Sequence, residues 1–321
     1  MTQKQLLFVI FVNSIWMSTA AGQNGDLKTL NTNNPKVRIA RFHSFQIFTG
    51  FGPNVLDQNV GAIKTLRAAI NEDFYEEFPN LPRLVHVMPN SDEPISAADF
   101  TWAEFQSQLT AASQQLEQND VLFVYLLAHG TWDSEGLKIH FSGDLVPRRQ
   151  IASQLKTIQS QRHLRLVVFM TDNCSEETTA SIESSATPTH VAGVWRALYF
   201  GHHGFLDLVS TSRGELGLLA GPSVFSIALS RALNLPAESN ATSFLARKQI
   251  DAAYIRFLDR NHDGTVSWPE FEVELQRQLD IAYADVKTQI MDSQPDSDIA
   301  RRISTQPRQT LAILQNPTTG Q

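Results

Sequence analysis

Two residues suited to covalent chemistry each follow a long apolar run in this chain of 321 residues. Cys174, the only cysteine, follows the run from Leu166 to Met170, and His129 lies 45 residues earlier, after the run from Asp120 to Ala128. A thiol has an ordinary pKa of about 8.5, so a nearby imidazole is the usual means of accepting its proton. Gly130 leaves room for a carbonyl group to approach and leaves backbone N–H groups free to hold an oxyanion. The pair therefore predicts nucleophilic chemistry at a cysteine.

The position of Cys174 alone leaves a second interpretation open, in which the thiol is a small buried hydrophobe.

The choice between the two interpretations of Cys174 depends on the helices and strands that position this residue. From residue 37 onward, apolar runs alternate with helical periods. The expected strands cover residues 37–45, 83–88, 120–128, 164–170 and 205–209, and the expected helices cover 59–74, 102–116, 148–158, 191–199 and 224–233. This alternation predicts an α/β fold with a three-layer, mostly parallel sheet.

The ends of two strands carry the candidate pair. In a parallel sheet the carboxyl ends of neighbouring strands meet at one edge, where ligands bind. If the helix at 148–158 joins two neighbouring strands, His129 and Cys174 face each other across one crevice.

The order of apolar strand, His-Gly, helix, apolar strand and Asp-x-Cys resembles the caspase and metacaspase family of cysteine peptidases, over roughly residues 37–235. The resemblance implies that His129 and Cys174 are the catalytic dyad, since their separation agrees with the ~50 residues expected for caspases. It implies protein or peptide substrates. The stretches "LVSTSRGELG" and "GPSVFSIAL" resemble the segments that flank the substrate groove and the final helix. Ser210 and Ser212 are accordingly expected to bind substrate.

Substrate preference is expected to depend on Asp172. The order Asp-Asn-Cys is similar to metacaspases, in which the acid two residues before the cysteine lines the pocket for the residue preceding the cut bond. The resemblance thus implies cleavage after Arg or Lys. Two alternatives stay open: Asp172 is a helix N-cap or turn residue, or Arg213 reads an aspartate as in caspases, although Leu216 to Leu219 is apolar.

A second motif, "DRNHDGTVSWPE", fits a calcium-binding EF-hand loop at every position. Oxygen-bearing residues occupy the ligand positions, and Gly264 permits the sharp turn. The expected ligands are Asp259, Asn261, Asp263, Thr265 (through its carbonyl), Ser267 (through water) and Glu270. Helical periods flank the loop, so residues 239–290 are expected to form a small helical EF-hand unit with Ca²⁺ as cofactor. The alternative is an acidic surface turn. A single EF-hand must pack on the first domain, dimerise or bind weakly.

The chain starts "MTQKQLLFVIFVNSIWMSTAAGQ", with a positive charge, an apolar run and small residues. This order is typical of a secretory signal peptide, assigned to residues 1–21. A membrane anchor is the alternative, but the run is shorter than the ~20 residues of a spanning helix. A secreted or periplasmic protein with no membrane segment after signal removal is expected. Residues 22–36 are then a linker, 37–238 a caspase-like catalytic domain, and 291–321 a polar, flexible tail.

Composition argues against other classes of partner. The net charge of −7, the pI near 5.7 and the absence of a basic cluster argue against nucleic-acid binding. The stretch "GFGPNV" lacks the third glycine of a dinucleotide turn, and no phosphate-binding GxxxxGK[ST] motif occurs. The oligomeric state is not determined by the sequence.

Two functional alternatives accompany the peptidase hypothesis: a catalytically silent, calcium-responsive binding module on the same fold, and ligation or transpeptidation by the same Cys-His pair. The stretch from Ser175 to Trp195 contains no Lys, Arg or Asp, so the chain is predicted to act uncut there. Self-cleavage, if it occurs, is expected at Arg148–Arg149 or Arg301–Arg302.

Overall fold

The structure is a computed structural model that describes residues 42–49, 84–88, 101–173, 176–177, 189–190, 194, 196–219, 223–235 and 252–319. These residues belong to one compact unit, Ile39–Gln321. The expected signal peptide, the linker, the helix at 59–74 and Cys174 lie outside the described residues. In the described part of the chain, no helix combines the length and apolar character that a membrane span requires.

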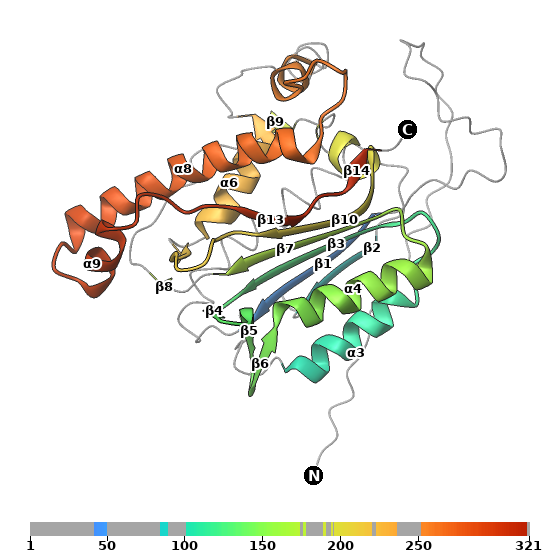
Figure 1. The fold of residues 1–321 in the computed structure, drawn as a ribbon, viewed down its shortest axis with the longest axis horizontal. Coiled ribbons are helices and arrows are strands. Elements are labelled where there is room, and N and C mark those ends of the chain that lie inside the picture. Colours follow the sequence, from blue (N-terminus) through green and yellow to red (C-terminus); the bar gives the residue numbers. More distant parts are fainter. Residues whose placement is uncertain are drawn as a thin grey trace. The chain divides into compact units, whose positions relative to one another are not determined.

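A mostly parallel sheet forms the centre of this unit (Figure 1). Its strand order is β13-β10-β7-β3-β1-β2, and the last five are parallel to one another. Their bounds are β1 Phe42–Thr49, β2 Leu84–Met88, β3 Val121–Ala128, β7 Leu166–Asn173 and β10 His202–Val209. Two short strands pair with β10 in the antiparallel direction, β13 (Ala312–Gln315) and β14 (Thr318–Thr319). The predicted α/β class with a mostly parallel sheet is confirmed.

Helices cover both faces of the sheet. On one face lie α3 (Trp102–Ser113) and α4 (Arg148–Arg162), and on the other lie α6 (Val224–Leu233) and α8 (Trp268–Ser293) (Figure 1). All eight residues of β3 are buried and alternate between two cores. A strand buried on both faces must be apolar at nearly every position, which explains the uninterrupted apolar run.

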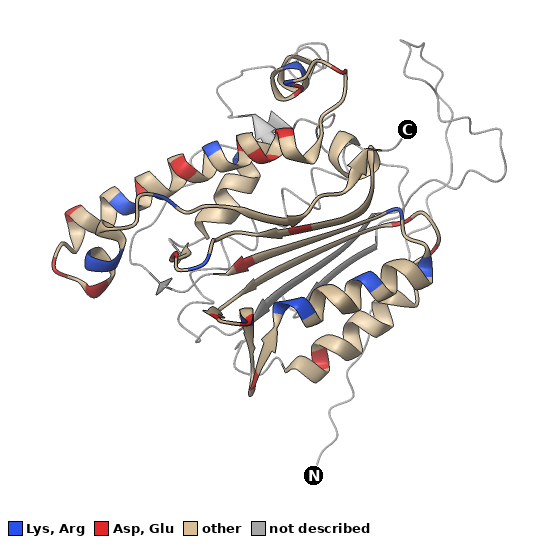
Figure 2. Cartoon of the chain, in the orientation of Figure 1, with Lys and Arg blue, Asp and Glu red and all other residues tan. Residues whose placement is uncertain are grey.

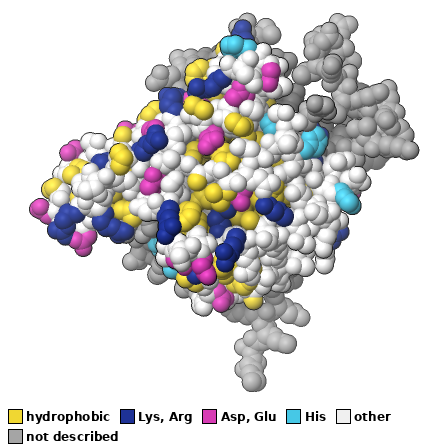
Figure 3. Space-filling model, viewed as in Figure 1, with side chains coloured by type: hydrophobic (Ala, Val, Ile, Leu, Met, Phe, Trp, Pro, Cys, Tyr) yellow, Lys and Arg dark blue, Asp and Glu magenta, His cyan; other side chains and the backbone are white. Residues whose placement is uncertain are grey.

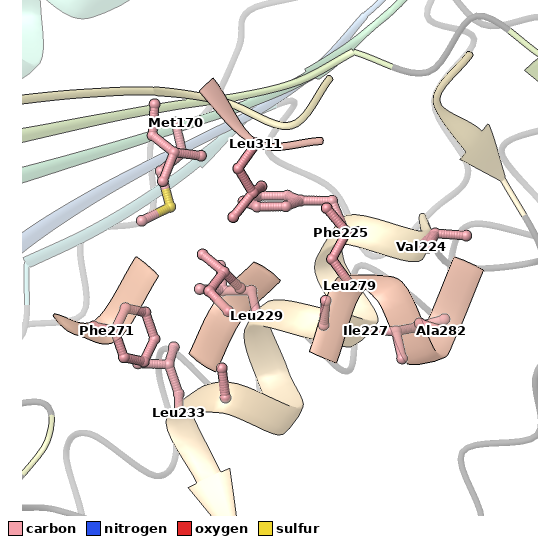
Figure 4. Close-up of a cluster of buried hydrophobic side chains, with 14 of the residues drawn as sticks. Met170, Val224, Phe225, Ile227, Leu229, Leu233, Phe271, Leu279, Ala282 and Leu311 are labelled. Atoms are coloured by element: carbon pink, nitrogen blue, oxygen red, sulfur yellow. The ribbon is translucent and has the colours of Figure 1, made fainter. Parts of the chain in front are cut away.

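The larger core lies between the sheet and the pair α6 and α8. Figure 4 shows Phe225 and Leu229 of α6 together with Met170 of β7 and Phe271 of α8. Trp268, the first residue of α8, is fully buried, and its indole N–H donates to the Leu198 carbonyl at 3.0 Å. The helix-loop-helix segment therefore packs on the sheet domain and shares its core, which the sequence left undecided.

Three small sheets accompany the central one. An antiparallel sheet that was not predicted from the sequence follows β3 and precedes α4 along the chain. Its strands are β4 (Gly130–Asp133), β5 (Gly136–Phe141) and β6 (Asp144–Pro147). Strand β8 (Glu176–Glu177) pairs with β11 (Leu218–Leu219), and β9 (Thr189–His190) pairs with β12 (Asn234–Leu235). A helix was expected at 191–199, and in the structure Arg196–Phe200 forms a π-helical turn.

The C-terminal residues differ from their expected flexible tail. Helix α8 continues to Ser293, α9 covers Asp298–Ser304, and β13 adds a strand to the central sheet. The polar composition of the region was misleading, because Ala300, Ile303 and Leu311 are buried in the larger core.

Arg148 forms a buried ion pair with Asp207 of β10. Its guanidinium also donates to the Thr171 hydroxyl at 2.7 Å and to the Leu208 carbonyl at 3.0 Å, and lies 4.3 Å from the ring centre of Phe169. Burial lowers the pKa of Arg148, and the nearby Asp207 opposes that shift. The expectation that Arg148 is an exposed cleavage site is wrong, because the side chain anchors α4 to the sheet.

Candidate active site

The ends of β3 and β7 lie side by side. Ala128 pairs with Asn173 at the carboxyl ends of these parallel strands. His129 is the next residue after Ala128, and Cys174 is the next residue after Asn173. The predicted adjacency of the two strands is confirmed. Cys174 lies outside the described residues, so its contact with His129 stays a prediction.

Gly130 keeps the chain after His129 close to the end of β7. A Cβ atom at this position would lie 3.0 Å from the Cβ of Asn173 and 2.8 Å from the Cδ1 of Leu137. A side chain here would require the end of the Leu137 side chain to move and Asn173 to shift by a few tenths of an ångström. The residue after His129 thus packs against the residue before Cys174.

The His129 side chain is partly exposed and lies beside His140 of β5. The two ring centres are 6.5 Å apart, and the His140 backbone N–H donates to the His129 carbonyl at 3.0 Å. Burial, and secondly the charge of His129, lower the pKa of His140 below its ordinary value. Its Nε2 lies 2.7 Å from the Thr131 hydroxyl. The only sign of His140 in the sequence is its place as a polar residue in an alternating strand.

Asp172 is fully buried, one residue before the end of β7. Its carboxylate accepts hydrogen bonds from the Tyr125 and Ser223 hydroxyls. Ser223 also accepts the Ser226 backbone N–H at 2.8 Å, at the start of α6. The carboxylate is therefore linked to the amino end of a helix, where negative charge is favourable. The role of Tyr125 is indicated by the sequence, because a lone hydroxyl in a buried strand requires a hydrogen-bond partner.

Asn173 is held from the β10 side. Its backbone N–H donates to the Ser210 hydroxyl at 3.1 Å, and its side-chain amide donates to the Thr211 hydroxyl. Ser210 and Thr211 are fully buried. Ser212 is partly buried and donates to the Thr310 carbonyl at 3.3 Å. In this structure, Ser210 and Ser212 bond within the protein, and their expected role in substrate binding stays a prediction.

The loop from Asp259 to Glu270 connects helical residues 252–258 with α8. Asp259 accepts the backbone N–H groups of Asp263 at 3.1 Å and Gly264 at 2.9 Å. Gly264 has a φ of +85°, which an L side chain adopts only with strain. Ser267 caps α8 and forms a reciprocal capping box with Glu270. The loop therefore bends where the motif requires it.

The carboxylates of this loop accept several hydrogen bonds. Glu270 Oε1 accepts the N–H groups of Arg260 and Asn261, at 2.9 and 3.1 Å. Burial raises the pKa of Glu270, but hydrogen bonds from Ser267, Asn261 and Arg260 outweigh it and leave the pKa below its ordinary value. In the described part of the chain, no three His, Cys, Asp or Glu side chains are arranged to hold a metal ion.

Charges of both signs are mixed on the surface. Acidic and basic residues both occur along α8 and α9, and acidic residues predominate on α8 (Figure 2). On the face in Figure 3, Lys and Arg side chains are interspersed with Asp and Glu. This face therefore presents no field of a single sign to a charged partner.

The layered α/β architecture with helices on both faces of a mostly parallel sheet is compatible with a caspase-like fold. Among solved structures, the chain is similar to the Drosophila initiator caspase Dronc, with 14% identity, a TM-score of 0.37, and coverage of 68% of this chain and 74% of that one. It is also similar to a protein from Geobacter sulfurreducens, with 10% identity, a TM-score of 0.42, and coverage of 87% and 95%. At such TM-scores neither similarity bears on function. No protein-family model matches the chain, and no curated protein matches it.

Proposed function

We propose that this chain is a secreted cysteine endopeptidase of the metacaspase-like type. The observation that carries the proposal is the pairing of Ala128 with Asn173, because His129 and Cys174 follow these two residues directly. The contact of Gly130 with Asn173 adds support, since it draws the two chain segments together. Export is proposed from residues 1–21, and the N-terminal sequence of the exported protein tests it.

In the proposed reaction, the Cys174 sulfur attacks the carbonyl carbon of the scissile peptide bond, and the thiol proton passes to the His129 imidazole. Backbone N–H groups near Gly130 hold the oxyanion. The C–N bond then breaks, and His129 gives its proton to the leaving amine. Water attacks the thioester and loses a proton to His129, which returns it to the sulfur, so the acid and the enzyme are released.

The proposed preference is for Arg or Lys before the cut bond, read by Asp172. Support comes from its place two residues before Cys174 and from its desolvation, which strengthens the attraction of a carboxylate for a cation. The Tyr125 and Ser223 hydroxyls hold the carboxylate in one position. Asp172 has no exposed surface in this structure, so the proposal requires its surroundings to open for substrate.

A calcium ion is proposed to bind the loop from Asp259 to Glu270. The donor set fits, because hard oxygen atoms from side chains, one carbonyl and one water suit Ca²⁺. Asp259, Asn261, Asp263 and Glu270 would bind through side chains, Thr265 through its carbonyl and Ser267 through water. Binding would exchange the hydrogen bonds that these carboxylates now accept from backbone N–H groups for bonds to the metal.

Covalent labelling tests the peptidase. A peptidyl chloromethyl ketone with a terminal Arg should add one inhibitor mass, located on Cys174 by peptide mapping, because a cysteine with a positioned imidazole alkylates fast. Peptide hydrolysis should fall by at least about a thousandfold in Cys174→Ala, since the nucleophile is lost. Cys174→Ser is the matched control for folding, and comparable hydrolysis by either variant would refute the dyad.

One observation favours a second candidate function, a catalytically silent binding module. Asp172 is already bonded to two hydroxyls and fully buried, as a purely structural carboxylate would be. In that case, the chloromethyl ketone would leave Cys174 unlabelled while the same protein bound a peptide measurably. Labelling of Cys174 with hydrolysis would exclude it.

A further inference from the structure

The C-terminal segment, residues 306–311, runs along the segment between β10 and α6. Gln306 uses both ends of its side-chain amide there. Its Oε1 accepts the Leu216 backbone N–H at 2.8 Å, and its Nε2 donates to the Leu216 carbonyl at 3.2 Å. A side chain that satisfies both backbone groups of one residue acts as a neighbouring strand would. The backbone at Leu216 is therefore fixed by a residue 90 positions away.

Further hydrogen bonds extend this attachment toward the sheet. The Gln309 amide donates to the Ser210 carbonyl at 2.9 Å. Glu215 accepts the backbone N–H groups of Ser212 at 3.1 Å and Thr310 at 2.7 Å. Gln309 is 1% exposed, and its Oε1 has no hydrogen-bond partner among the described residues. A buried amide with an unpaired oxygen lowers the stability of the fold, so packing alone does not account for a glutamine at this position.

Helix α8 fixes the C-terminal segment from the other side. The Gln276 amide donates to the Gln309 carbonyl at 2.9 Å and accepts the Leu311 N–H at 2.8 Å. The Lys287 ammonium donates to the Gln306 carbonyl at 2.7 Å. The segment is thus tied to a long helix that belongs to the larger core, and it is not a loosely attached tail.

The residues that the C-terminal segment holds in turn hold the end of β7. Ser210 and Thr211 bond to Asn173, as described above. Gly217 lies so close that a Cβ there would be 2.2 Å from the Asn173 carbonyl oxygen. Contacts therefore lead without interruption from α8 through the C-terminal segment and residues 210–217 to Asn173.

From this sequence of contacts we propose that the C-terminal segment is a brace that positions the end of β7 at Asn173, with Gln309 as its main positioning residue. Its consequence for catalysis rests on the proposed function, because Cys174 follows Asn173. Among the described residues, Gln309 bonds to Ser210 and to Gln276. It acts through Ser210, whose carbonyl it holds while the Ser210 hydroxyl holds Asn173.

The test uses two readouts on the full chain. Hydrogen–deuterium exchange of a peptide covering residues 166–173 reports the position of the strand end without any assumption about catalysis, since the Asn173 N–H bonds to Ser210. Steady-state kcat and KM report the catalytic consequence. Gln309→Met keeps the side-chain length and removes the donor. Gln315→Met, exposed on β13, is the matched control.

Gln309→Met should raise exchange at the end of β7 about tenfold, as expected for the loss of one buried hydrogen bond, and should lower kcat with little change in KM. Gln315→Met should change neither. Gln306→Met, at a partly exposed position, should show the same pattern more weakly and decides the question if Gln309→Met does not fold. Unchanged exchange at Asn173 overturns the brace. Increased kcat also overturns it, because the segment would then be a removable cover. If Gln309→Met raises exchange but Cys174→Ala hydrolyses peptides as fast as the native chain, the peptidase is refuted. The brace is then still supported.

Discussion

The loop at 259–270 and the end of β7 are held by opposite kinds of contact. In the loop, the hydrogen bonds of the candidate calcium ligands join residues at most ten positions apart, as between Arg260 and Glu270, whereas Trp268 beside them bonds to the distant Leu198. At the end of β7, Asp172 bonds to residues 47 and 51 positions away, and Asn173 bonds to residues 37 and 38 positions away. The candidate ligands of the loop are held by their own sequence neighbours, and the strand end is held by the rest of the chain.

This difference predicts how each region responds to change. A loop closed by local side chain to backbone bonds keeps its shape when one ligand is altered, so ligand binding and folding are separable there. A strand end held by distant buried groups is complete only when the whole domain is packed. Substitutions there should therefore affect stability, specificity and chain dynamics together.

The largest expected effect is on the stability of the sheet. Arg148→Leu leaves Asp207 buried without its partner, which should lower the free energy of unfolding by about 3–5 kcal/mol. Urea denaturation measures this. Arg149→Ala, at the exposed neighbouring position, is the control and should change the value by less than about 0.5 kcal/mol. The double change Arg148→Met with Asp207→Leu should recover most of the lost free energy of unfolding. If Arg148→Leu lowers this free energy no more than Arg149→Ala does, the buried ion pair is disproved.

The next effect concerns substrate preference at the end of β7. Asp172→Asn keeps the size of the side chain and removes its charge. If Asp172 reads a cation, kcat/KM for Arg substrates should fall by at least roughly 30-fold, from the ~2–5 kcal/mol of a desolvated charge pair. Substrates with a neutral residue there should be little affected.

Asp144→Asn, exposed on β6, controls for the change in net charge. Equal losses on basic and neutral substrates would show that Asp172 only holds Tyr125 and Ser223. Asp172 and Asn173, the two residues at the end of β7, would then both have structural roles.

The local region was the more predictable from sequence. The bend at Gly264 and the capping box of Ser267 and Glu270 follow from residue types at fixed spacing, and both are present. The adjacency of β3 and β7 was also predictable, because alternating apolar runs and helices restrict the topology. Calcium binding by the loop stays a prediction.

The contacts at the end of β7 were not predictable. The apolar run predicts a strand that ends at Met170, but the polar residues Thr171 to Asn173 continue it because β3 pairs with all three and β10 pairs with Thr171. Nothing near Gln309 distinguishes it from an exposed glutamine, since its burial results from a contact 99 positions away. For the same reason the C-terminal residues were predicted to be flexible.

A smaller effect is expected from metal binding. Calcium at about 100 times its dissociation constant should raise the stability of the native chain by ~2.7 kcal/mol, because only the folded loop binds it. Glu270→Gln should abolish the rise in thermal midpoint, while Glu272→Gln, two positions along α8, should keep it. An identical midpoint for the native chain in EDTA and in calcium would refute the site.

The smallest effect tests whether the loop depends on its own hydrogen bonds without metal. Hydrogen bonds from the Thr265 hydroxyl and N–H, and from Asn261, hold the pKa of Asp263 below its ordinary value. The unfolded chain therefore takes up this proton at a higher pH than the folded chain. The carboxylate stabilises the fold above the ordinary value of about 3.9, and this contribution is lost as the pH falls through the lower folded value.

In EDTA, the native chain should therefore exceed Asp263→Asn in urea midpoint near neutral pH, and the gap should close in acid. The exposed-turn variant Asp296→Asn is the control. A gap that persists unchanged below about pH 3 would mean that the loop is held by contacts other than the charge of Asp263. The loop would then resemble the end of β7 in being held by the rest of the domain.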